Sequence, residues 1–186
     1  MQRSELTADK LRDSYIICIC EGAAEEAVID LLLDANRLIF HREQLIDGGV
    51  THKRKACDIE TEYLHRDYEK PVNIIRVLDS RKESFKLGKI YADRYRIYNV
   101  YTRPEIEMLL IISEKHYDNY TQKIGKEKGK PSEYCKSILF PCDAVKSKKF
   151  WLDYFREPER LIGAIRRYHQ LHGRAKEMNL SHLLRW

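Results

Sequence analysis

The chain has 186 residues, and 34 Lys and Arg against 29 Asp and Glu give a formal net charge of +5 at pH 7. This length suits one domain with a substantial core better than two domains. No apolar run approaches the roughly 20 residues of a membrane-spanning helix, no signal-peptide pattern is visible, and the five cysteines form no CxxC pair, so we expect a protein of the reducing cytoplasm.

The first part of the sequence predicts two strands and two helices. Residues 15–20 (YIICIC) form a short apolar run typical of a buried strand, and Gly22 would then allow a tight turn. Residues 23–37 place apolar side chains on one stripe, which predicts an amphipathic helix. Residues 38–46 alternate imperfectly before an Asp-Gly-Gly turn and predict a second strand. A second helix is expected over residues 55–69.

The next part repeats the alternation of strand and helix. Residues 72–78 (VNIIRVL) predict a buried strand that runs directly into Asp79, and residues 83–95 predict a helix. Residues 97–101 (IYNVY) are β-branched and aromatic, which favours a third core strand. Residues 102–105 (TRPE) then fit a capping box at the start of an apolar helix.

This alternation predicts an α/β fold with a mainly parallel sheet flanked by helices. Residues 115–149 hold nine Lys against four acidic residues, with Gly and Pro among them, and predict an exposed basic loop. The C-terminal part predicts two or three packed helices. We therefore expect a catalytic core over residues 1–115, with the Lys-rich loop and C-terminal helices of residues 116–186 packed on it.

Acidic side chains follow the ends of the predicted strands. Glu21 and Asp79 each come directly after a strand, and Glu107 lies in the turn after the third. Ligands of parallel sheets bind beyond the carboxyl ends of the strands, so these acids should converge at one edge. A carboxylate there is costly to bury unless it is paired, hydrogen-bonded or bound to a metal.

Several of the acids also have a structural explanation. Asp79 suits the N-cap of a following helix, and Glu105 suits a capping box. Glu25 and Glu26 lie in the first turn of a helix, where carboxylates complement the helix dipole. For Glu26 we favour this structural role, whereas for Glu21 we favour a functional role, because a structural role explains it least well.

The ordered set of these motifs resembles the Toprim domain of topoisomerases, bacterial primases and nucleases. Glu21-Gly-Ala-Ala-Glu25 is similar to the Glu-Gly-x-x-Glu form of the OLD-like Toprim proteins found in phage-defence systems. Asp79 matches the first acid of the family's Asp-x-Asp, and Pro104-Glu-Ile-Glu107 is similar to the turn before an apolar helix. The resemblance covers roughly residues 14–115.

The resemblance implies a nuclease that uses Mg²⁺ or Mn²⁺, with Glu21, Asp79 and Glu107 as catalytic residues. The implied metal ligands are Glu21, Glu25, Asp79, Glu83 and Glu107. Glu83 enters as the nearest substitute for the second acid of the Asp-x-Asp pair, because that position is Arg81. Arg81 would instead grip a phosphate.

The basic side chains indicate a phosphate-binding surface. We expect the nucleic-acid contacts to come from Arg81, Lys126, Lys128, Lys130, Lys148 and Lys149. The expected function is an endonuclease that acts on DNA or on a structured, tRNA-like RNA as the effector of an anti-phage system. Because a Walker A sequence is missing, any ATPase or sensor would be a separate partner chain, and a homo-oligomer stays open. The alternatives are an inactive Toprim-like module that regulates a partner ATPase, and an RNA-processing Toprim nuclease.

Overall fold

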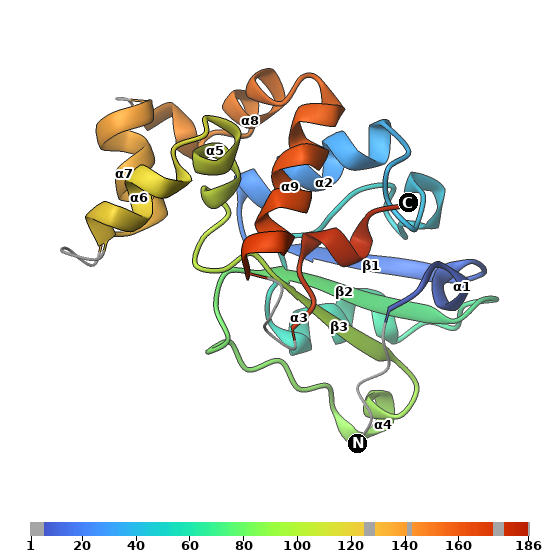
Figure 1. Cartoon of the computed structure of the whole chain (residues 1–186). Helices are drawn as coiled ribbons and strands as arrows, with labels where there is room; N and C mark the ends of the chain where they lie inside the picture. The colour runs from blue at the N-terminus through green and yellow to red at the C-terminus, as the bar shows by residue number, and fades with distance from the viewer. Residues whose placement is uncertain (1–5, 125–128, 141–142, 173–176, 186) are drawn as a thin grey trace.

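A three-stranded parallel sheet in the order β1-β2-β3 lies at the centre of the molecule (Figure 1). The strands cover Tyr15–Cys20, Val72–Leu78 and Arg96–Tyr101. All residues of β2 are buried, as expected for a parallel strand with a covered surface on both faces. The sheet confirms the predicted α/β class and the three strands that carry it. The computed structural model describes residues 6–124, 129–140, 143–172 and 177–185.

Side chains of each strand alternate between two apolar cores, one on either face of the sheet. In β1, Ile16 and Cys18 belong to the larger core, whereas Ile17 and Ile19 belong to the smaller one. This alternation follows from the two-residue period of a strand. The continuous apolar run of β1 therefore supplies side chains to both cores.

The two cores are covered by helices of unequal extent (Figure 1). The smaller core lies against α3 (Ala56–Ile59), which continues as a π-helical turn over Glu60–Leu64, and against Tyr91 of α4 (Lys89–Ala92). The larger core contains residues of α1 (Ala8–Leu11), α2 (Ala23–Asp34), α5 (Met108–Ser113), α6 (Tyr117–Ile124), α7 (Pro131–Tyr134), α8 (Lys148–Tyr154) and α9 (Pro158–His172). Among the described residues no helix is long and apolar enough to span a membrane.

The predicted strand over residues 38–46 was wrong. This segment contains isolated bridges and a 3-10 helix over Arg42–Gln44 in place of a strand. Leu45 and Thr51 each form one parallel bridge with β1, so the segment still runs beside the sheet. The Gln44 side chain also donates a hydrogen bond to the Ser14 carbonyl, at 3.1 Å, just before β1.

The predicted helix over residues 83–95 was also largely wrong, since only Lys89–Ala92 is helical. Residues 82–88 form no regular secondary structure. They are held by two side chains: Glu83 pairs with Arg76 at 2.7 Å, and the Phe85 ring lies 4.2 Å from the Arg76 guanidinium carbon. Tertiary contacts to a buried arginine thus override the helical spacing of the sequence.

The capping box over residues 102–105 does not form, because the helix begins later, at Met108. Thr102 continues the pairing of the sheet: its N–H donates to the Leu78 carbonyl at 2.8 Å. The carboxylate of Glu105 instead accepts a hydrogen bond from the Ser132 N–H at 2.8 Å. Both side chains therefore have partners outside the helix they were expected to cap.

The basic tract of residues 115–149 is not the exposed loop that was predicted. Its described part forms α6, α7, a π-helical turn over Cys135–Leu139 and a 3-10 helix over Asp143–Lys146. Tyr120, Tyr134 and Cys135 are buried in the larger core. Aromatic residues scattered among the lysines thus supply an apolar face that the charge pattern concealed.

The helices predicted for the C-terminal part are confirmed as α8, α9 and a 3-10 helix over Leu180–Leu183. The segment after α9 joins distant parts of the chain. Leu184 forms an antiparallel bridge with Leu38, and the Tyr101 N–H donates to the Met178 carbonyl at 2.8 Å.

Candidate functional site

Two predicted site residues meet at the carboxyl edge of the sheet. Glu21 directly follows β1 and Asp79 directly follows β2, and these strands are neighbours. The Asp79 N–H donates to Glu21 Oε2 at 3.1 Å. No helix begins directly after Asp79, so this residue is not the N-cap of a helix.

Glu25 lies in the first turn of α2, with only 6% of its surface exposed. Burial, together with the negative charges of Glu107, Glu21 and Asp79, raises its pKa to about 7. The site thus holds a buried carboxyl group that is poised to bind a proton or a cation near neutral pH.

Gly22 is important at this site because it has no side chain next to the Glu25 carboxylate. The chain passes from β1 to α2 through two bend residues, Glu21 and Gly22, and the Gly22 backbone is extended, with φ −146° and ψ −177°. A Cβ atom at this position would lie 3.2 Å from Glu25 Oε2. The missing side chain therefore accommodates the Glu25 carboxylate.

Glu107 stands at the N-cap position of α5, beyond the end of β3. Burial raises its pKa, as do the charges of Glu105 and Asp79, although Lys136 acts in the opposite direction. Burial also raises the pKa of Asp79 to about 6, together with a hydrogen bond to Glu21 and the Glu21 charge. Four acids thus influence one another at this edge: Glu21, Glu25, Asp79 and Glu107. We call them the acidic cluster.

Sequence reasoning missed Arg54, the cation that contacts this cluster. Its Nη2 lies 2.6 Å from Glu21 Oε1, and its Nε donates to Glu83 Oε1 at 2.7 Å. Arg54 follows the segment that bridges to β1 at Thr51. No periodicity or motif marks it, because its role depends on where an irregular loop passes the sheet edge.

Glu83, predicted as a metal ligand, lies between two arginines. One carboxylate oxygen accepts from Arg54, and the other accepts from Arg76 Nη2 at 2.7 Å. Arg76 is only 2% exposed, and burial lowers its pKa while Glu83 opposes that change. Glu83 would reach a metal ion only after these pairs break.

Arg81, predicted to grip a phosphate, is exposed and pairs with Glu177 of the C-terminal segment. Glu177 also lies near Arg103, at 3.8 Å from Nη1. Arg81 therefore contacts a carboxylate outside the acidic cluster.

The predicted lysines divide into three groups. Lys126 and Lys128 lie outside the described residues. Lys148 is tied to α2 through ion pairs with Glu26 at 2.8 Å and Asp30 at 2.6 Å. Lys130 and Lys149 are exposed. Glu26 also lies 3.1 Å from His52, so its contacts fit the structural role that we favoured.

The acidic cluster fits a divalent metal by the chemistry of its donors. Carboxylate oxygens are the ligands that Mg²⁺ and Mn²⁺ prefer, and the pKa values of three members are raised, first by burial and then by the charges of neighbouring carboxylates. Within the described residues, however, no three His, Cys, Asp or Glu side chains are already arranged to hold a metal ion. Metal binding would require side chains to turn, above all at Glu21, where Arg54 is bound.

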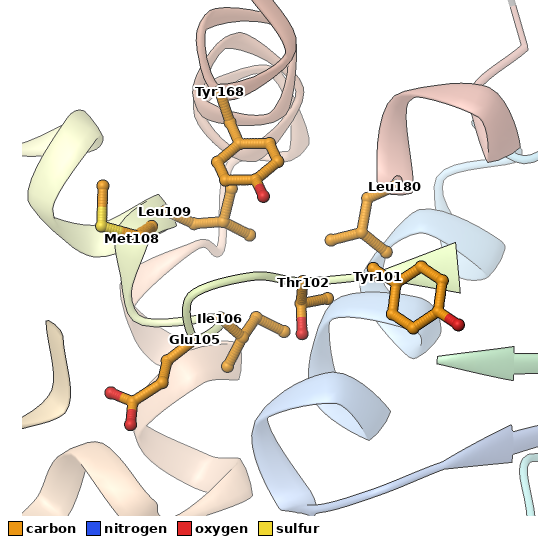
Figure 2. Close-up of a pocket in the computed structure, with 8 residues that line it drawn as sticks. All are labelled: Tyr101, Thr102, Glu105, Ile106, Met108, Leu109, Tyr168 and Leu180. Carbon is orange, nitrogen blue, oxygen red and sulfur yellow. The ribbon is translucent and has the colours of Figure 1, made fainter. Parts of the chain in front are cut away.

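A small pocket lies beside this edge, between the loop after β3 and the helix α9 (Figure 2). The Glu105 carboxylate points away from the other side chains, and the Tyr168 hydroxyl donates a hydrogen bond to the Arg103 carbonyl. The lining is mainly apolar and consists of Tyr101, Thr102, Glu105, Ile106, Met108, Leu109, Tyr168 and Leu180. This composition suits packing of the loop against α9 better than recognition of a charged ligand.

Comparison with known proteins gives no match to this chain among protein-family models, curated proteins or solved structures.

Proposed function

We propose that this chain is a nuclease that depends on a divalent metal and cleaves phosphodiester bonds in DNA or in a structured, tRNA-like RNA. The observation that carries the proposal is the gathering of Glu21, Glu25, Asp79 and Glu107 at the carboxyl edge of a parallel sheet. The resemblance of the same residues to Toprim motifs supports it independently of their positions in space.

The metal would be held by Glu21, Asp79 and Glu107, with Glu25 next to them. Mg²⁺ or Mn²⁺ in such a site neutralises phosphate charge and activates water. Glu25 would hold or release a proton near neutral pH, because its pKa is about 7. The Glu21 carboxylate, bonded to the Asp79 N–H, is fixed in position relative to β2.

We further propose that the exposed Lys130 and Lys149 contribute to nucleic-acid binding. The role as effector of an anti-phage system, with a separate ATPase or sensor chain, rests on the OLD-like form of the motifs around Glu21 and Glu107.

The test is cleavage of nucleic acid by purified protein with Mg²⁺ or Mn²⁺. Glu21→Gln removes the central carboxylate and should lower the rate by about 100-fold or more. The matched control is Glu43→Gln, because Glu43 is an exposed glutamate outside the acidic cluster. If Glu21→Gln cleaves as fast as the wild type, the proposed role of Glu21 is wrong.

One observation favours a second function, an inactive Toprim-like module that binds and regulates a partner ATPase. Arg54 occupies a Glu21 oxygen, and Arg81 stands where the family has an acid. Soaking crystals in Mn²⁺ separates the two functions. An inactive module should show no metal within about 2.0–2.6 Å of the carboxylate oxygens near Glu21 and Asp79.

A further inference from the structure

We infer that Arg54 is a built-in counter-ion of the acidic cluster, which a divalent cation must displace from Glu21 in order to bind. The inference rests on the proposed function, because it assigns a role in metal binding at that same site. It goes beyond that function by naming a side chain that sets the metal concentration at which the site fills.

The geometry places Arg54 in direct competition with a metal ion. The guanidinium lies 2.6 Å from Glu21 Oε1, and the second oxygen of that carboxylate accepts the Asp79 N–H. Both Glu21 oxygens therefore have partners in this structure. A metal ion that uses Glu21 must take the oxygen now held by Arg54 or break the bond to the backbone of β2.

Glu83 gives Arg54 a second anchor outside the cluster. Arg54 Nε donates to Glu83 Oε1 at 2.7 Å, and Glu83 is itself fixed by the buried Arg76. Asn99 accepts a hydrogen bond from Arg76 at 3.2 Å, which ties this anchor to β3 as well. When Nη2 leaves Glu21, the guanidinium can thus remain bound to Glu83 and need not enter solvent.

Arg54 is a replaceable partner because it carries one positive charge among several carboxylates. Its guanidinium pairs with Glu21 and Glu83, and Glu25 lies in the same cluster with only 6% of its surface exposed. The guanidinium therefore compensates part of the negative charge at this edge, and a small divalent cation would compensate more of it.

The solvent exposure of Arg54 favours its replacement by a metal ion. The Arg54 side chain is 42% exposed, whereas those of Glu21 and Glu83 are 17% and 20% exposed. Arg54 comes from an irregular loop, so its side chain can move without disturbing the sheet. The cluster itself is built on β1, β2, α2 and α5, and keeps its place when Arg54 leaves.

The experiment measures binding of Mn²⁺ alone, by electron paramagnetic resonance and calorimetry, to metal-free full-length protein. Arg54→Met keeps the aliphatic stem and removes the charge, so it should bind Mn²⁺ about tenfold more tightly than the wild type. Arg54→Lys keeps the charge on one nitrogen but loses the planar fork whose separate nitrogens contact Glu21 and Glu83, and it should fall between them. Arg12→Met is the control, because Arg12 precedes β1 at the opposite edge of the sheet and pairs with Asp9. Thermal unfolding of each variant verifies that it is folded.

The outcomes separate this inference from the proposed function. Equal or weaker Mn²⁺ binding by Arg54→Met would overturn the inference, whereas the proposed function stands if Glu21→Gln still abolishes binding and cleavage. Tighter binding by Arg54→Met, but not by Arg12→Met, supports the inference even where the wild type cleaves slowly. If neither the wild type nor Arg54→Met binds Mn²⁺ at millimolar concentration, both the metal site and the role of Arg54 are rejected.

Discussion

Glu25 is a carboxylic acid at a buried position, where its charged form is unfavourable in free energy. The sequence identified it as the second acid of a Glu-Gly-x-x-Glu pattern, in the first turn of the helix that forms α2. Its burial could not be predicted from the residues alone, since burial depends on how closely α2 packs against the sheet edge. The same limit applies to Arg54, whose partners Glu21 and Glu83 come from distant parts of the chain.

The raised pKa of Glu25 predicts a pH-dependent stability. Its pKa rises from 4.5 to about 7 on folding, so the folded chain binds more protons than the unfolded chain between these values. The stabilisation that comes from proton binding by Glu25 is therefore complete below pH 4.5 and is lost as the pH rises through 7. Glu25→Gln should consequently raise the free energy of unfolding at pH 8 by about 3 kcal/mol relative to the wild type.

Urea denaturation in EDTA at pH 5 and pH 8 provides the measurement for Glu25. The difference between wild type and Glu25→Gln should be larger at pH 8 than at pH 5. The exposed Glu43→Gln should shift neither value. An identical pH dependence in wild type and Glu25→Gln would show that Glu25 is not the group that titrates.

At the level of secondary structure, strands were easier to predict than helices. β1 and β2 follow continuous apolar runs that only a sheet covered on both faces can bury. Residues 82–88 were mispredicted because their conformation is set by contacts of Glu83 and Phe85 with Arg76 of the neighbouring strand, which helical spacing does not reveal. The helices between residues 117 and 146 were mispredicted because buried aromatic residues such as Tyr120 and Tyr134 are scattered among the lysines.

The packing of α8 on α2 gives a prediction for stability. Trp151 of α8 is fully buried, and its indole N–H donates to the Val145 carbonyl at 2.8 Å. Trp151→Ala should lower the free energy of unfolding by about 3–5 kcal/mol, because it leaves a large cavity. Trp151→Phe should lose less, since it keeps most of the ring and gives up a hydrogen bond worth about 1 kcal/mol.

Chemical denaturation of both Trp151 variants would check this order. Phe150→Ala is the neighbouring control, because Phe150 is only partly buried and should cost less than Trp151→Ala. An equal loss of unfolding free energy for Phe150→Ala and Trp151→Ala would mean that burial of Trp151 is not the main contribution of α8 to stability.

At the scale of the whole molecule, substitutions at two adjacent lysines should distinguish effects on nucleic-acid binding from effects on stability. Lys148 is committed to Glu26 and Asp30 of α2, whereas Lys149 is exposed. If the proposed nucleic-acid contact is correct, Lys149→Ala should weaken binding of a short labelled DNA duplex and reduce the slope of log K against log salt by about 0.9. Lys148→Ala should leave that slope nearly unchanged and loosen the contact between α8 and α2.

Fluorescence anisotropy over a range of salt concentrations, with EDTA present to prevent cleavage, measures both slopes. Equal slopes for wild type and Lys149→Ala would place the phosphate contacts elsewhere on the surface.

The bridge between Leu38 and Leu184 constrains the order in which the protein can assemble during synthesis. Ile39 donates its N–H to the Leu183 carbonyl at 2.8 Å, and both Leu183 and Leu184 are buried in the larger core. While Leu38 is already outside the ribosome, its partners have not yet been translated. The larger core therefore closes only after this late segment has been made, and a nascent chain that stalls earlier would expose apolar surface to chaperones.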